Sequence, residues 1–166
     1  TQAALAAWAP MCCAEVAAVH ADNYPSRAAD YGPGLKGLIE AGSATSGLDY
    51  ARAHDVRQRF RGQMAALFRG VDVLVAPAFM GQNMTLTRFA SFGAEVDDWD
   101  NLLRYTAPFD VSGSPTLSLP AGCNADGAPF GFQLVADLLN EPLLVRAGDA
   151  WQRATDHHRR RPALAP

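Results

Sequence analysis

A short apolar run in the middle of the chain limits the possible folds more than any other feature. Residues 71–76, Val-Asp-Val-Leu-Val-Ala, are rich in β-branched side chains and are followed at once by Pro77. A run of this length and composition is typical of a strand that is buried on both faces. A long helix is expected directly before it, and Gly70 can supply a left-handed helix stop between the two. Helix, tight turn and buried strand in succession predict an α/β arrangement of layers.

The spacing of apolar residues predicts the helices. They are expected over residues 1–21, 34–41, 46–69, 98–105 and 141–155. Ser46 and Asp49, three positions apart, resemble a capping box at the start of the longest helix. Pro10 should start or kink the first helix. Gly42 should end the second, and Pro108 should end the fourth.

Two strands and a long loop complete the expected elements. Residues 115–121 and 129–136 predict strands, and the turn between them, Asn-Ala-Asp-Gly at 124–127, tolerates positive φ, so that a β-hairpin is expected. Residues 78–96 are typical of a loop at the carboxyl end of a buried strand, which is often a functional position. There is no internal repeat and no linker, and we therefore treat residues 1–166 as one unit.

Composition argues against several classes of partner. A net charge of −3 argues against a broad phosphate-binding surface, so no nucleic acid is expected to bind. The basic run at residues 159–161 is interpreted as a solvated helix end. No apolar run approaches the roughly 20 residues that span a bilayer, and we therefore expect no membrane partner.

The cysteines and histidines give no sign of a metal site. Cys12, Cys13 and Cys123 form no disulfide framework, which favours a reducing compartment and a cytoplasmic location. No CxxC motif or His/Cys cluster has zinc spacing, and the side chains of His157 and His158 should diverge on a helix. We expect no metal and no cofactor.

Four stretches in order resemble the C-terminal third of the amidase signature family. They are VDVLVAP at 71–77, TAPFDVSGSPTLSLP at 106–120, APFGFQLV at 128–135 and DAWQRATDHHRRRP at 149–162. Residues 14–33 and 50–60 also resemble that family, so the resemblance covers nearly the whole chain. It implies that residues 1–166 are the C-terminal segment of an amidase-signature domain, with a mixed β-sheet flanked by helices.

The resemblance also implies an activity, the hydrolysis of carbon–nitrogen amide bonds through an acyl-enzyme. Members of the family use a serine nucleophile, a second serine, a lysine and a Gly/Ser-rich stretch that stabilises the oxyanion. This chain has no such stretch, and its single lysine, Lys36, lies in an ordinary helix pattern. Ser112 and Ser114 come nearest to a glycine-flanked serine, but Pro115 follows at once. Each histidine is interpreted as a solvated or capping residue of its helix.

We therefore expect the nucleophile to belong to a portion of polypeptide that precedes Thr1, which is not an initiator methionine. This chain alone should be inactive. Its expected partners are the N-terminal catalytic portion of the same amidase and a small-molecule amide substrate, and a homo-oligomer is a further candidate. Two alternatives stay open. One is a non-catalytic binding or scaffold module derived from the amidase fold, and the other is the A subunit of a glutamine-dependent tRNA amidotransferase.

The resemblance points to Arg57 as a candidate substrate-binding residue. It occupies the place of an arginine that can bind a substrate carboxylate in those amidotransferase subunits, and a guanidinium suits that task. A surface arginine without such a role is the alternative. Those subunits also have an acidic residue where this chain has Leu103, and the difference favours a less polar amide.

Six further residues are predicted around the substrate. Thr106, Phe109, Asp110 and Ser114 are expected to form the wall near the acyl site, with Phe79 and Met80 at its mouth. Core packing is the alternative role of Phe79 and Met80. Turn capping is the alternative role of Asp110, which stands where many relatives have Asn.

Overall fold

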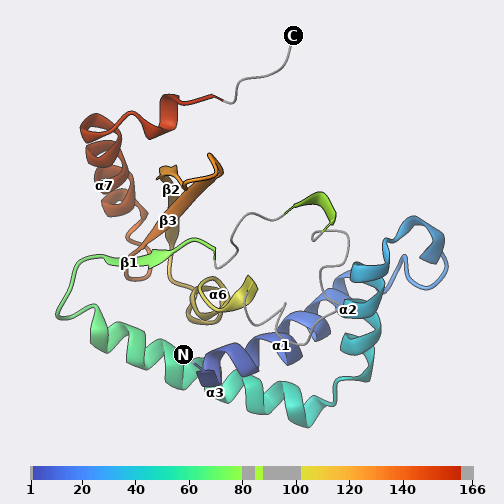
Figure 1. Ribbon diagram of the computed structural model, residues 1–166. Coiled ribbons are helices and arrows are strands. Elements are labelled where there is room, and N and C mark those ends of the chain that lie inside the picture. Colours follow the sequence, from blue (N-terminus) through green and yellow to red (C-terminus); the bar gives the residue numbers. More distant parts are fainter. Residues whose placement is uncertain (1, 80–84, 88–101, 162–166) are drawn as a thin grey trace.

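The computed structural model describes residues 2–79, 85–87 and 102–161 (Figure 1). The helices are α1 (Gln2–His20), α2 (Pro33–Ala44), α3 (Gly47–Leu67), α6 (Ala107–Ser112) and α7 (Glu141–Ala154), with short 3-10 turns at Ala28–Asp30 and His157–Arg159. The strands are β1 (Leu74–Pro77), β2 (Thr116–Cys123) and β3 (Pro129–Val135). The predicted α/β class is confirmed. Of the helix expected over residues 98–105, residues 102–105 are described, and residues 102 and 103 are helical. Most of the loop expected over residues 78–96 lies outside the described residues.

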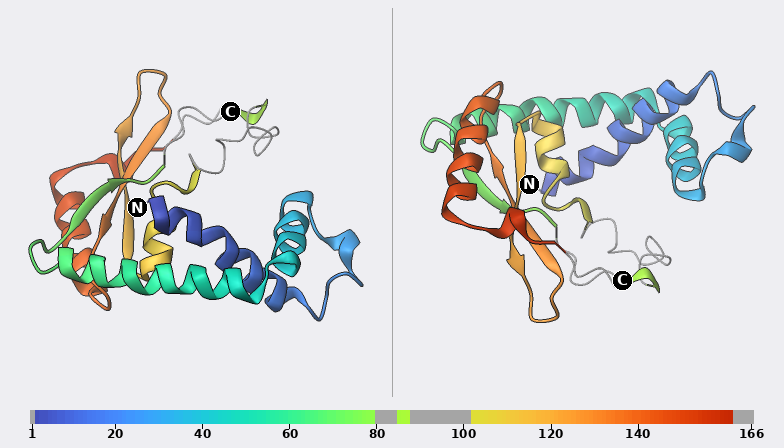
Figure 2. Two further views of the ribbon diagram at one scale, coloured as in Figure 1. Left: turned by 90° about the horizontal axis from the view of Figure 1, so that it is seen from below. Right: turned by 90° about the horizontal axis from the view of Figure 1, so that it is seen from above.

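The described strands form one antiparallel sheet in the order β1-β3-β2. Helix α7 covers one side of it, where Leu144 and the half-buried Trp151 pack against Leu119 and Leu134. The indole N–H of Trp151 also donates to the Pro120 carbonyl at 2.9 Å. The N-terminal helices and α6 lie on the other side of the sheet (Figure 2). The sheet therefore separates the small α7 layer from the larger helical layer.

The helical layer is built by α1, α3 and α6. Ala4, Phe60, Met64 and Val111 form its buried core, and Leu74 of β1 packs against that core from the sheet. Sheet and helices are joined further by Gln133, whose buried side-chain amide donates to the carbonyl of Pro77 at 2.8 Å and to the carbonyl of Tyr105. Helix α6 is thus held between the sheet and two long helices.

The strand formed by the short apolar run differs from its prediction. It begins at Leu74 and includes Pro77, and it is not buried on both faces, because the side chain of Val75 is 70% exposed. In the described sheet β1 also pairs only with β3 and so lies at an edge. An edge strand also tolerates Pro77, which has no N–H to donate.

Two predicted roles for glycine in ending helices are wrong. Helix α2 continues through Gly42 to Ala44, because Gly42 faces α1 and a Cβ there would lie 1.8 Å from the Cys13 carbonyl oxygen. Gly70 has no positive φ; α3 ends instead at Phe68, which has right-handed helical angles. The first glycine serves close helix packing, and the second follows a helix that has already ended.

Two prolines lie within helices. Helix α1 begins at Gln2 and contains Pro10, so that Pro10 does not start it. Pro108 lies in the first turn of α6, where its missing N–H has no helical partner to lose, and the helical residues 102 and 103 end before it.

Two local predictions are confirmed. Ser46 caps α3, since its hydroxyl oxygen accepts the Asp49 N–H at 3.0 Å and its O–H donates to the Asp49 carboxylate at 2.6 Å. In the hairpin turn, the Asn124 side-chain oxygen accepts the N–H groups of Asp126 and Ala128, and Gly127 has a φ of 80°.

Helix α1 is long and apolar enough to cross a membrane by length and composition, which corrects the expectation that no such run exists. Core helices of globular proteins and N-terminal signal sequences meet the same criterion, so it assigns no membrane location. Here α1 packs against α2, α3 and α6. On its surface, Glu15 accepts a hydrogen bond from the Tyr50 hydroxyl of α3 at 3.1 Å.

Candidate functional site

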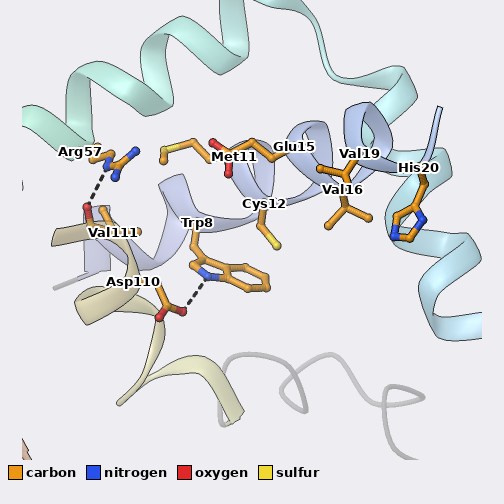
Figure 3. Close-up of a pocket in the computed structure, with 10 residues that line it drawn as sticks. All are labelled: Trp8, Met11, Cys12, Glu15, Val16, Val19, His20, Arg57, Asp110 and Val111. Atoms are coloured by element: carbon orange, nitrogen blue, oxygen red, sulfur yellow. Dashed lines mark hydrogen bonds between the residues drawn. The ribbon is translucent and has the colours of Figure 1, made fainter. Parts of the chain in front are cut away.

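A cavity of about 430 Å³ lies where α1, α3 and α6 meet (Figure 3). A volume of this size suits a small-molecule ligand. We call it the α1/α6 cavity. Its lining residues are Trp8, Met11, Cys12, Glu15, Val16, Val19 and His20 of α1, Arg57 of α3, and Asp110 and Val111 of α6. Of the predicted site residues, the structure therefore brings together Arg57 and Asp110.

Local sequence explains why α6 is short and firmly placed. Pro108 lies in its first turn, and Gly113 ends it in the left-handed conformation with a φ of 76°. Ala107 and Val111 are buried between the helices. The last carbonyl groups of a helix have no partner within it. For Val111, the Nε–H of Arg57 supplies one at 3.2 Å, 54 positions away in the chain.

Asp110 is held by a second contact across the cavity. The indole N–H of Trp8 donates to its Oδ2 at 3.2 Å, and Asp110 provides no side-chain cap for α6. Burial raises the pKa of the Asp110 carboxyl, and the hydrogen bond from Trp8 opposes that increase. The side chain therefore faces the cavity wall and does not cap a turn.

The other polar groups of the cavity are already engaged with tyrosines. Glu15 accepts from Tyr50, and the His20 ring nitrogen Nδ1 lies 3.1 Å from the Tyr31 hydroxyl. Burial also raises the pKa of the Cys12 thiol, with the neighbouring Cys13 and acidic groups adding to the effect. A thiol with a raised pKa is mostly protonated and is a poor nucleophile.

The remaining predicted wall residues form the ends of α6 and part of the core. Ser114 is buried, and its hydroxyl oxygen accepts from the Ser112 hydroxyl at 2.9 Å. Thr106 is the N-cap residue of α6, without a side-chain capping bond. Phe109 packs against the core of the helical layer. These three residues support α6, and none of them is among the residues that line the cavity.

Of the two predicted mouth residues only Phe79 is described, and it is not among the described residues that line the cavity. Phe79 follows β1 and is 42% exposed, so core packing does not account for it either. Met80 lies outside the described residues. Leu103, at the position that is acidic in the amidotransferase subunits, is half-buried.

Sequence reasoning missed most of the α1 side of the cavity. The apolar stripe that predicted the helix over residues 1–21 includes Trp8, Cys12 and Val16. It was the only sequence signal for this side of the cavity. Nothing local could show that Trp8 faces Asp110, because 102 positions separate the two residues.

Comparison with known proteins gives consistent matches. The family model described as Amidase matches residues 2–145. The protein named "Putative amidase AmiD" of Mycobacterium tuberculosis (strain ATCC 25618 / H37Rv) is 39% identical over 150 residues, which are 90% of this chain and 32% of that protein. The A subunit of the glutamyl-tRNA(Gln) amidotransferase of Gloeobacter violaceus is 39% identical over 119 residues, which are 70% of this chain and 23% of that protein.

The solved structures agree with these matches in fold. A crystal structure of an amidase superposes with a TM-score of 0.75 and 24% identity, over 91% of this chain and 35% of that one. At this identity the likeness concerns the fold alone. The chain spans about a third of the length of AmiD.

Proposed function

Because the chain belongs to the Amidase family, we propose that it forms the C-terminal part of an amidase that hydrolyses a carbon–nitrogen amide bond. The observation that carries the proposal is the α1/α6 cavity, a small-molecule site built entirely from residues that the family model matches. The apolar wall of Trp8, Met11 and Val16 suits the carbon skeleton of an amide. Arg57 and Asp110 supply polar groups beside this wall.

The described residues hold no serine and lysine arranged for catalysis. Ser112 and Ser114 bond to each other at the end of α6. Lys36 belongs to α2, and α2 lies at the opposite end of α1 from α6 (Figure 2). We therefore place the nucleophile, the relay serine and the lysine in polypeptide outside this chain. There the serine hydroxyl attacks the amide carbonyl carbon, the amine leaves with a proton, and water hydrolyses the resulting acyl-enzyme ester.

Exposed apolar surface supports a large partner segment. Val75 on the edge strand is 70% exposed and Leu139 before α7 is 88% exposed. Such residues are buried when a neighbouring segment packs on them. We propose that the N-terminal catalytic portion of the same amidase pairs with the β1 edge and covers this surface.

The test compares residues 1–166 with the complete polypeptide that contains them. Release of amine from aryl, aliphatic and amino-acid amides is expected only from the complete polypeptide. A serine-directed fluorophosphonate should label a residue outside residues 1–166, as mapped by peptide mass spectrometry. Turnover by residues 1–166 alone, or labelling of Ser112 or Ser114, would refute the placement of the nucleophile.

A second candidate is the A subunit of a glutamine-dependent tRNA amidotransferase, favoured by the 39% identity to the Gloeobacter violaceus protein. It predicts that the complete polypeptide releases ammonia from glutamine and transfers it to a glutamyl-tRNA. Leu103 argues against this candidate, because the resemblance implies an acidic residue at that position in amidotransferase A subunits. Glutamine-dependent transfer in the presence of tRNA would favour the amidotransferase over the amidase.

A further inference from the structure

The α1/α6 cavity presents charged groups from three helices, and none of the three forms an ion pair within the described residues. Arg57 of α3 and Asp110 of α6 both line it, together with Glu15 of α1. Within the described part of the chain, neither Arg57 nor Asp110 forms an ion pair, with each other or with a further residue. Arg57 is half-buried and Asp110 is exposed, so a ligand in the cavity can reach the Asp110 carboxylate.

Arg57 is already engaged in holding the fold. Its Nε–H donates to the Val111 carbonyl at 3.2 Å, which ties the last turn of α6 to α3. Figure 3 shows that this contact lies at the same end of the cavity as Asp110 and Trp8, away from Val19 and His20. This contact holds the last turn of α6 in place. It thereby positions Asp110, which directly precedes Val111 on that helix.

Asp110 lines the cavity and has one carboxylate oxygen available to a further donor. Trp8 donates to Oδ2, while no described group donates to Oδ1. Burial raises the pKa of this carboxyl, so a further hydrogen-bond donor would stabilise its ionised form. With Glu15 included, the cavity holds two carboxylates and one guanidinium, and this balance favours a ligand with a basic group.

We propose, on the basis of the proposed amidase function, that Asp110 is the specificity-determining residue of the cavity and accepts a hydrogen bond from an amino group of the substrate. The amide that is hydrolysed then carries a basic amine as well as the scissile bond. Arg57 is a positioning residue that holds α6 in place. Trp8 orients the carboxylate, and the apolar wall of α1 contacts the rest of the substrate.

The test uses the complete polypeptide and two substrates that differ only in the amine. L-phenylalaninamide has an α-amino group, and 3-phenylpropionamide lacks it. A charge-assisted hydrogen bond predicts a kcat/KM about 10-fold to 100-fold higher for the amine-bearing amide. Asp110→Asn removes the charge, and the ratio of the two kcat/KM values should fall to about one.

Two variants separate this role from a structural one. Arg57→Lys keeps the positive charge and an N–H donor for the Val111 carbonyl, so α6 and Asp110 should stay in place and the ratio should remain at the unmodified enzyme's value. Asp55→Asn is a matched control, because Asp55 is an exposed carboxylate of α3 that pairs with Arg59 outside the cavity. Asp55→Asn should leave the ratio of the two kcat/KM values unchanged. A ratio that survives Asp110→Asn, or that collapses with Arg57→Lys, would overturn the proposal.

A binding measurement separates failure of this inference from failure of the proposed function. Calorimetric titration with benzylamine and with benzyl alcohol needs no turnover. We expect the amine to bind at least about 10-fold more tightly and to lose that advantage in Asp110→Asn. If the amine binds more tightly but the complete polypeptide hydrolyses no amide, the amine site is supported and the proposed amidase function is refuted. Amide hydrolysis with equal binding of amine and alcohol would refute the amine site alone.

Discussion

Gly42 of α2 lies directly against the backbone of Cys13 in α1, so closely that a Cβ on Gly42 would be 1.8 Å from the Cys13 carbonyl oxygen. The obstructing atom belongs to the backbone of a helix and cannot turn aside as a side chain can. The contact between α1 and α2 therefore depends on the absence of a side chain at this position.

Replacement of Gly42 by Ala should push the two helices apart and lower the free energy of unfolding by about 3 kcal/mol. Gly37→Ala is the matched control on the same helix, since a Cβ there would have no neighbour within 4 Å. It should stabilise the protein by about 0.5–1 kcal/mol through the higher helix propensity of Ala. Urea denaturation followed by circular dichroism measures both, and equal effects of the two substitutions would contradict the packing role of Gly42.

Ser46→Ala should remove the N-cap of α3 and cost about 1 kcal/mol. The loss arises because the Asp49 N–H, in the first turn, has no other helical acceptor. Ser43→Ala is the control, because the Ser43 hydroxyl only donates to the Ile39 carbonyl within α2. Thermal or urea unfolding should show a clearly smaller loss for Ser43→Ala than for Ser46→Ala.

Asp110 should make stability depend on pH in a predictable direction. Its pKa is raised by burial in the folded protein, so the folded state favours the protonated carboxyl. The stability that this group contributes is fully present below its unfolded pKa and is lost as the pH rises through its folded pKa. Asp110→Asn cannot ionise, so its free energy of unfolding relative to the unmodified protein should increase over that rise in pH. A difference that is constant with pH would contradict the raised pKa.

Trp8→Phe should raise the pKa of Asp110 further. The indole N–H stabilises the ionised carboxylate, and phenylalanine keeps the ring but has no donor. Nuclear magnetic resonance titration of the Asp110 carboxyl carbon measures the change directly. An unchanged pKa in Trp8→Phe would mean that the hydrogen bond does not contribute to the titration.

Residues 1–166 on their own should self-associate. The β1 edge has unpaired backbone groups along its outer side in the described sheet, and the exposed Val75 adds apolar surface beside them. Val75→Lys should lower the associated fraction, because a charged side chain on an edge strand opposes pairing. Size-exclusion chromatography with light scattering tests both, and a monodisperse, inactive monomer would favour a free-standing module.

Two of the residues that line the α1/α6 cavity were predicted from the sequence as site residues, and the rest were not. Arg57 and Asp110 were expected from the family resemblance, and the structure brings them into one cavity, while their binding of substrate stays a prediction. Phe109, also expected near the substrate, is partly buried and packs against the cluster that contains Phe60 and Ala4, far away in the chain. Which face a short helix presents depends on its neighbours and not on its own six residues.

The sequence by itself determined the features whose causes lie within a few residues. The Ser46 cap, the Asn124 turn and the order of helices and strands follow from side chains that bond to nearby backbone. Only the tertiary structure decided that Gly42 is a contact point and that Val75 lies at an exposed edge. It alone also brought Trp8 to Asp110 across 102 positions. Contacts of that range depend on how whole elements pack, and no short window of sequence contains both partners.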